Sequence, residues 1–130
     1  MRSLFLFFLA FAALPLLAAD PEVIPIFPNG APGAVGTEDK DIPTLTIHPA
    51  PQGSDTRTAV VVFPGGGYRH LAVGHEGKEI AAWLNARGVT ALVLMYRLAP
   101  RYKHPAMLQD AQRAIRTARS LSQKYGYEKS

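Results

Sequence analysis

The residues best placed to do chemistry are three consecutive glycines, Gly65 to Gly67, which follow the apolar run at residues 59–63 after one proline. A continuous β-branched and apolar run is typical of a strand buried on both faces, as in parallel sheets. Glycine has no Cβ, so the backbone N–H groups of the following turn can approach a ligand closely and converge on one point. Such a loop is suited to holding an oxyanion as it develops.

Glycine-rich loops after a strand also bind nucleotides, but the flanking residues do not fit that role. A dinucleotide site needs a third glycine where His70 stands, and an acidic residue where the next strand ends in Tyr96 and Arg97. A phosphate-binding P-loop needs Gly-Lys-Ser/Thr, whereas Gly67 is followed by Tyr68. A purely structural turn remains an alternative, although three glycines exceed what a turn requires.

The remaining polar residues point to no metal or organic cofactor. His70 and His75 lie near glutamates, but they match no zinc-binding template and form no His-Glu-x-x-His motif. None of the serines, at positions 3, 54, 120, 122 and 130, stands in a Gly-x-Ser-x-Gly turn. The sequence therefore predicts an anion-stabilising loop without a recognisable nucleophile.

The first 19 residues are predicted to be a signal peptide. Arg2 is followed by an apolar run that ends in small residues at Ala18 and Ala19. An uncleaved membrane anchor is the alternative, but the run is slightly short for a bilayer span and contains Pro15. We therefore expect a secreted or periplasmic protein with no membrane contact after cleavage.

Composition narrows the possible partners. The chain has 130 residues, no cysteine and a net charge of +4, which falls to +3 when Arg2 is removed. Without disulfides, stability must come from an ordinary core. No basic run is interleaved with aromatic residues, so nucleic acid is not an expected partner.

The rest of the chain predicts alternating strands and helices. Residues 20–41 are rich in Pro and Gly and indicate an extended arm, and residues 42–49 alternate as an edge strand does. Buried strands are expected at 58–63 and 89–96, joined by a helix over 76–87, which suits parallel pairing. A helix from Pro105 to Gly126 follows. Arg97, after a strand, and Asp110, early in this helix, are expected to form a structural ion pair.

The pattern from residue 42 to 127 resembles the α/β-hydrolase superfamily, specifically its secreted bacterial carbohydrate-esterase branch related to hormone-sensitive lipase. The resemblance rests on the order and spacing of five segments, which are Phe63-Pro64-Gly65-Gly66-Gly67-Tyr68, His75-Glu76-Gly77, Ala82-Trp83-Leu84-Asn85, Tyr96-Arg97-Leu98-Ala99-Pro100, and His104-Pro105-Ala106 leading into residues 110–116. Many lipases carry histidine where this chain has Pro64, and this difference favours the carbohydrate-esterase branch.

The resemblance implies a role for each residue of the loop. Gly66 and Gly67 match the backbone N–H donors of the oxyanion hole. Gly65 and Tyr68 are expected to contact substrate, with packing beneath the loop as an equal alternative for Tyr68. Residues 42–130 would then be an incomplete α/β domain, the N-terminal part of a mostly parallel hydrolase sheet with crossover helices.

The nucleophile strand of that family would follow the last helix and pair beside the strand at 58–63. We therefore expect an N-terminal fragment of a serine esterase, acting on acetyl or feruloyl esters of carbohydrates and inactive by itself. The alternative is a small non-catalytic protein that binds an anion or sugar through the glycine loop. The sequence identifies neither the acyl group, the alcohol nor the oligomeric state.

Overall fold

The computed structural model describes residues 20–129, which form a four-stranded sheet with helices on both faces. The elements in chain order are β1 (Glu22–Pro25), a short 3-10 turn η1 (Asp39–Asp41), β2 (Thr44–His48), β3 (Thr58–Val62), a π-helical segment η2 (Val73–Lys78), α1 (Glu79–Asn85), β4 (Val89–Met95) and α2 (Ala106–Tyr125). η2 runs directly into α1.

The strand order is β1-β2-β4-β3, and the pairing is mixed. β3 and β4 are parallel, with Val61 opposite Leu92, as expected for two strands joined by a crossover helix. β1 with β2 and β2 with β4 are antiparallel. The sheet was expected to be mostly parallel. Within residues 20–129, β3 and β4 are the one parallel pair.

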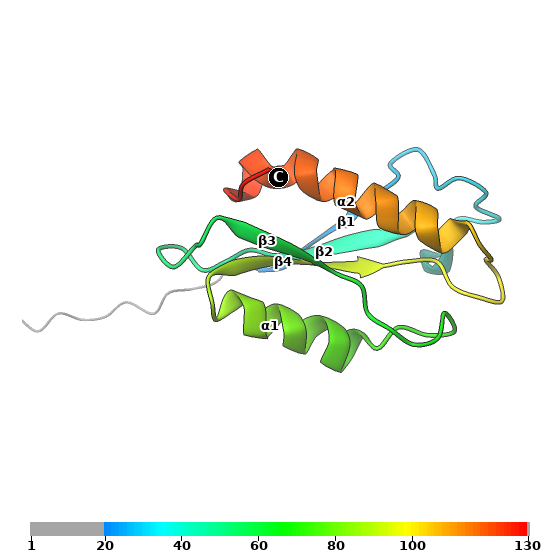
Figure 1. Cartoon of the computed structure of the whole chain (residues 1–130). Coiled ribbons are helices and arrows are strands. Elements are labelled where there is room, and N and C mark those ends of the chain that lie inside the picture. Colours follow the sequence, from blue (N-terminus) through cyan, green and yellow to red (C-terminus); the bar gives the residue numbers. More distant parts are fainter. Residues whose placement is uncertain (1–19, 130) are drawn as a thin grey trace, which may run out of the picture.

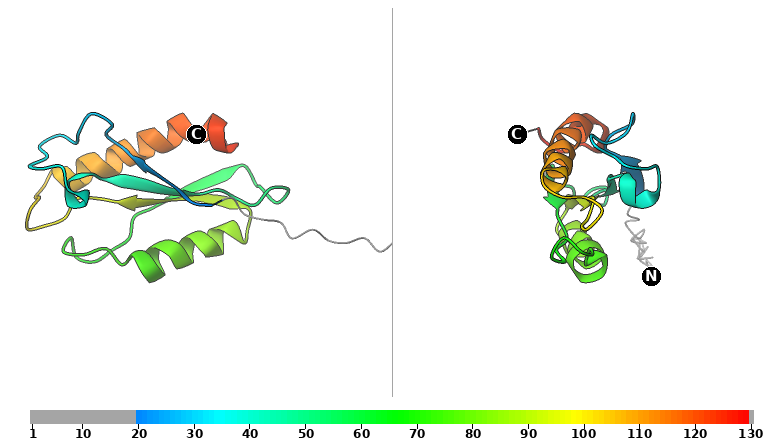
Figure 2. Two further views of the ribbon diagram at one scale, coloured as in Figure 1. Left: turned by 180° about the vertical axis from the view of Figure 1, so that it is seen from behind. Right: turned by 90° about the vertical axis from the view of Figure 1, so that its right-hand side faces the viewer.

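The helices α1 and α2 cover opposite faces of the sheet (Figure 1), and the view from behind and the end view show the same layers (Figure 2). The core between the sheet and α2 holds Leu45, Leu92, Leu94, Ala114 and Ala118. A smaller cluster lies beneath α1. Alanines on the inner face of α2 let the helix approach the strands closely, because they leave no long side chain between the two layers.

The N-terminal arm differs from the sequence prediction in one respect. Residues 22–25 of the Pro/Gly-rich stretch form β1, which pairs with β2. The segment predicted as an edge strand, residues 42–49, is therefore an inner strand, and its neighbours are β1 and β4. A four-residue strand is too short for its alternation to stand out among prolines.

β3 forms the opposite edge of the described sheet. Val60 and Phe63 are 37% and 44% exposed, so the apolar run expected to be buried on both faces is only partly covered within residues 20–129. The predicted signal peptide, residues 1–19, lies outside the described residues. In the described part, no helix combines the length and apolar character that a membrane span needs.

Candidate active site

The glycine loop lies at the carboxyl ends of the parallel strands β3 and β4. It begins after Val62, and the segment after β4 runs alongside it, where the N–H of Ala99 donates to the carbonyl of Tyr68 at 2.8 Å. In open α/β sheets, ligands bind in the crevice outside these strand ends. The fold therefore puts the glycines where α/β proteins place their active sites.

The backbone of the loop requires glycine at its centre. Gly66 and Gly67 have φ angles of 140° and 63°, and Tyr68 follows with 61°. A Cβ at position 66 would lie 2.1 Å from the carbonyl oxygen of His70, whereas a Cβ at position 67 would meet nothing within 4 Å. Position 66 is thus closed to any side chain by both conformation and space.

The carbonyl groups of Gly65 and Gly66 are both directed toward residues 69–72, which follow the loop and are called the returning segment below. The carbonyl of Gly65 accepts from the N–H of Ala72 at 2.9 Å, and that of Gly66 accepts from Arg69 at 3.2 Å. In a trans peptide the N–H points opposite to the C=O. The N–H groups of Gly66 and Gly67 are therefore both directed away from this returning segment, and neither donates to an acceptor within residues 20–129.

The N–H of Gly65 is already engaged. It donates to Oε2 of Glu76 at 2.6 Å, while the preceding carbonyl, that of Pro64, accepts from the hydroxyl of Tyr96 at 2.7 Å. Partial burial raises the pKa of Tyr96, which keeps that hydroxyl protonated and able to donate. Of the three glycines, only Gly66 and Gly67 have N–H groups available to a ligand.

A cavity of about 740 Å³ opens beside the loop. Its walls come from the glycine loop, the segment after β4 and the first turns of α2, and include Phe63, Gly65, Gly66, Gly67, Tyr68, Tyr96, Tyr102, His104, Met107 and Leu108. Tyr68 is 59% exposed and meets Tyr96 edge to face at 6.2 Å between ring centres. The structure thus brings all four predicted site residues to one cavity, and their roles stay predictions.

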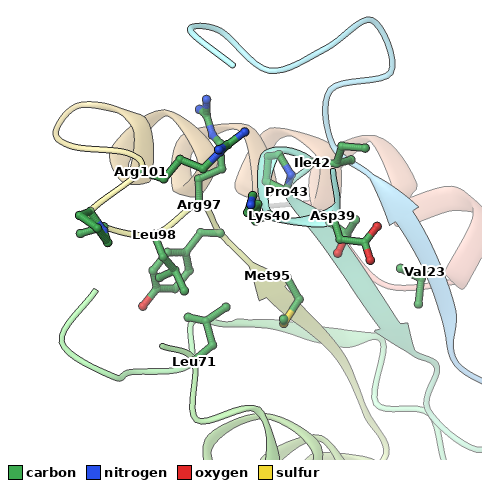
Figure 3. A pocket seen from close by; sticks show the side chains of 14 residues that line it. Val23, Asp39, Lys40, Ile42, Pro43, Leu71, Met95, Arg97, Leu98 and Arg101 are labelled. Carbon is green, nitrogen blue, oxygen red and sulfur yellow. The ribbon is translucent and has the colours of Figure 1, made fainter. Parts of the chain in front are cut away.

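A second cavity of similar volume lies toward η1 and β2 (Figure 3). Tyr96 and Ala99 line both cavities, so the segment after β4 separates them. At this second cavity Lys40, Arg97 and Arg101 are each paired with a carboxylate, at 2.5, 2.7 and 2.6 Å. Its three cations are thus already engaged, so the cavity beside the glycine loop is the stronger candidate.

The described serines lie away from the loop. Ser54 is in the turn before β3, at the opposite end of the sheet, and its hydroxyl donates to the carbonyl of Pro51. Ser120 and Ser122 belong to the C-terminal half of α2. Among residues 20–129, no three His, Cys, Asp or Glu side chains are grouped closely enough to hold a metal ion.

Two residues that contact the loop, Glu76 and Tyr96, are not identified as such by the sequence. No local pattern shows that a carboxylate in a helical segment will turn back to a backbone N–H 11 positions earlier. For Tyr96, the available signal is its position at the end of a strand that was expected to lie next to the loop.

Comparisons with known proteins agree with this geometry, although no family model matches the chain. It is 38% identical over 61 residues to an acetylxylan esterase of Xylanibacter ruminicola, covering 47% of this chain and 12% of that protein. It is 31% identical over 91 residues to esterase LipC of Mycobacterium tuberculosis, and this match covers 70% of this chain and 20% of that protein. The chain thus spans a fifth or less of the length of these curated relatives.

Among solved structures, an acetyl ester-xyloside bifunctional hydrolase from Caldicellulosiruptor lactoaceticus matches with a TM-score of 0.68 and 38% identity. The match covers 82% of this chain and 39% of that one. The described residues are therefore part of an α/β-hydrolase domain. In both sequence and structure, the chain is similar to the esterase branch of that superfamily.

Proposed function

We propose that this chain supplies the oxyanion-binding loop of a secreted serine esterase whose nucleophile, histidine and acid lie outside residues 1–130. The observation that carries the proposal is the pair of N–H groups at Gly66 and Gly67. Both are directed away from the returning segment, and both lack an acceptor within the described residues. They belong to a loop that lines a cavity large enough for a small ester.

The chemistry that such a pair supports is acyl transfer. When a serine attacks an ester carbonyl, the carbonyl oxygen becomes negative in the tetrahedral intermediate. Two preorganised N–H groups stabilise that charge more than they stabilise the neutral ester, and each such donor contributes about 2.7–4 kcal/mol. Collapse of the intermediate then releases the alcohol and leaves an acyl-enzyme, which water hydrolyses.

Carbohydrate esters with acetyl or feruloyl groups are the substrates we propose. The names of two similar proteins, an acetylxylan esterase and an acetyl ester-xyloside hydrolase, support this class. The cavity supports it as well, because the exposed ring of Tyr68 stands at its edge, where it can pack against a sugar or an aromatic acyl group. Export is supported by the apolar run that follows Arg2 and ends in small residues.

The test uses the full-length protein, with whatever the gene encodes beyond residue 130. We expect it to hydrolyse p-nitrophenyl acetate and acetylated xylan, and to lose both activities on reaction with a fluorophosphonate that labels one serine. A full-length protein that neither turns over these esters nor takes up the label would contradict the proposal.

A non-catalytic anion- or sugar-binding protein is the alternative, because unpaired N–H groups also bind anions. The coding sequence beyond codon 130 separates the two. A Gly-x-Ser-x-Gly segment favours the esterase, and an immediate stop codon favours the binding protein.

A further inference from the structure

One peptide group at the entrance to the glycine loop is held from both sides. Its carbonyl, on Pro64, accepts from the hydroxyl of Tyr96 at 2.7 Å, and its N–H, on Gly65, donates to Oε2 of Glu76 at 2.6 Å. Tyr96 follows β4, and Glu76 belongs to η2, so the two partners come from different elements. The plane of this peptide is therefore set by two separate parts of the fold.

The contact with Glu76 depends on glycine at position 65. A Cβ there would lie 2.7 Å from Oε2 of Glu76, closer than real side chains allow. Gly65 therefore leaves room for a carboxylate to reach the backbone, which is a use of this glycine separate from flexibility.

Within residues 20–129, the Glu76 carboxylate forms no ion pair with a buried cation. The Glu76 side chain is 48% exposed, and its basic neighbour is the exposed His75, with Nε2 3.6 Å from Oε1. An exposed pair of this kind contributes little to stability. The short bond to the Gly65 N–H is the specific interaction that Glu76 makes.

The peptide that Glu76 holds is directly followed by the two that present the free N–H groups. Gly66 and Gly67 have no side chains to restrict rotation, so their orientation depends on the bonds that the carbonyls of Gly65 and Gly66 accept and on how the chain enters and leaves the loop. The end of the loop is anchored by the carbonyl of Tyr68, which accepts from the N–H of Ala99 at 2.8 Å. Catalytic donors must stay within about 0.5 Å of the productive geometry, so the entrance needs an equivalent anchor.

We propose that Glu76 is a positioning residue for the oxyanion-binding loop, acting through the Pro64–Gly65 peptide together with Tyr96. This inference rests on the proposed esterase function. Glu76 acts mainly as a hydrogen-bond acceptor, so glutamine, which keeps an acceptor oxygen, replaces it for the most part. The positioned N–H groups stabilise the negative charge that develops on the carbonyl oxygen of the substrate in the transition state. Loss of Glu76 is therefore expected to affect kcat more than KM.

The experiment compares Glu76→Ala, Glu76→Gln and the control Glu79→Ala in the full-length protein. Glu79 opens α1 three residues later, is exposed, and makes no ion pair or side-chain hydrogen bond within residues 20–129. With p-nitrophenyl acetate, we expect Glu76→Ala to lower kcat roughly 10- to 100-fold at nearly constant KM, the upper end being the cost of about 1 Å of misplacement. Glu76→Gln should recover most of this loss, and Glu79→Ala should leave kcat and KM unchanged.

Amide hydrogen exchange gives a readout that does not depend on turnover. The Ala72 amide donates to the carbonyl of Gly65, on the peptide next to the one that Glu76 holds. We expect Glu76→Ala to speed its exchange while Glu79→Ala does not, with the melting temperature of both variants close to that of the wild type. An inactive wild-type protein in which Glu76→Ala still speeds this exchange would contradict the esterase function and leave the positioning of the loop supported.

Three outcomes would overturn the inference. The first is an active wild-type esterase in which Glu76→Ala leaves kcat unchanged. The second is a Glu76→Gln variant as impaired as Glu76→Ala, which would mean that charge and not the acceptor matters. The third is an unaltered exchange rate at Ala72 in Glu76→Ala.

A coupling measurement tests the part assigned to Tyr96. Tyr96→Phe removes the donor from the other side of the same peptide. Because the two residues hold one group, we expect Glu76→Ala to cost less in the Tyr96→Phe background than in the wild type. Effects on kcat that simply multiply would remove Tyr96 from the proposal.

Discussion

Asp110 accepts hydrogen bonds from both the backbone N–H and the guanidinium of Arg97, and both side chains are almost fully buried. The backbone bond is 2.9 Å, the shortest guanidinium contact is 2.7 Å, and the side chains are 0% and 1% exposed. Arg97 also donates to the carbonyl of Pro32 at 2.7 Å. One buried pair thus joins the end of β4, the start of α2 and the N-terminal arm.

Breaking this pair should be strongly destabilising in the full-length protein. Arg97→Met leaves the Asp110 carboxylate buried without its partner, and Asp110→Asn leaves the guanidinium without a counter-charge. Each is expected to lower the free energy of unfolding by about 3–5 kcal/mol. Urea denaturation measures the change.

The control is Glu22→Gln, which removes the exposed ion pair of Glu22 with Lys124 at 2.8 Å. Exposed pairs contribute little, so the denaturation midpoint should hardly move. Equal midpoints for all three variants and the wild type would show that the buried pair has no structural role.

Alanine at position 66 should reduce activity more than alanine at position 67. A Cβ at position 66 overlaps the carbonyl of His70, so the loop must change shape and lose its donor geometry. The expected loss in kcat is about 10²–10³-fold, the cost of removing one oxyanion donor. At position 67 the space is open and only the strain at φ 63° remains, about 1–2 kcal/mol.

Gly74→Ala is the matched control, because a Cβ there meets nothing within 4 Å and no left-handed φ is required. Its kcat for p-nitrophenyl acetate should equal that of the wild type. Similar losses at positions 66 and 67 would contradict the steric explanation.

Asp41 should make the protein sensitive to acid. Its buried carboxylate accepts from the guanidinium of Arg101 at 2.6 Å and from the hydroxyl of Tyr102 at 2.5 Å. These bonds, led by the one from Arg101, hold the pKa of Asp41 well below its ordinary value of 3.8. Because the unfolded chain takes up the proton first, the stabilisation is complete above that value and declines as the pH falls below it.

We therefore expect Asp41→Asn to be less stable than the wild type at pH 7, and to lose less of its remaining stability between pH 5 and about pH 2. Melting temperatures across this range, followed by circular dichroism, measure both effects. Parallel curves for the two proteins would show that Asp41 is not the responsible group.

The exposed edge of β3 should make the isolated 130-residue chain prone to association. Within residues 20–129, β3 pairs with β4 alone, and Val60 is 37% exposed beside the open backbone. Unpaired apolar edges add further strands, and a charged side chain discourages this. We expect the wild-type chain to form insoluble or associated material, and Val60→Lys to shift it toward monomer in size-exclusion chromatography with light scattering.

Gln123→Lys is the control for added charge alone, since Gln123 is exposed on α2 and not on the edge strand. A wild-type chain that elutes as a monomer and unfolds in one cooperative transition would contradict this prediction.

The positions of β3, β4 and the crossover helix were predictable because their patterns are local, although β3 is only partly buried within residues 20–129. The strands predicted at 58–63 and 89–96 correspond to β3 and β4, and Gly126 ends α2 in the left-handed conformation as expected. The side of a helix that would be buried was harder to predict. Ala81 and Leu84 are buried, whereas Ile80 and Trp83 in the same apolar stripe are 41% and 55% exposed.

For this protein, the sequence alone determined the order of strands and helices, the position of the glycine loop at a strand end and the esterase resemblance. These depend on neighbouring residues and on spacing along the chain. Tertiary structure alone decided that β1 pairs with β2 and that Glu76 and Tyr96 hold the Pro64–Gly65 peptide. It also decided that the carbonyls of Gly65 and Gly66 face the returning segment. Such contacts join residues that local patterns do not relate, and hydrogen-bond geometry in the packed fold selects them.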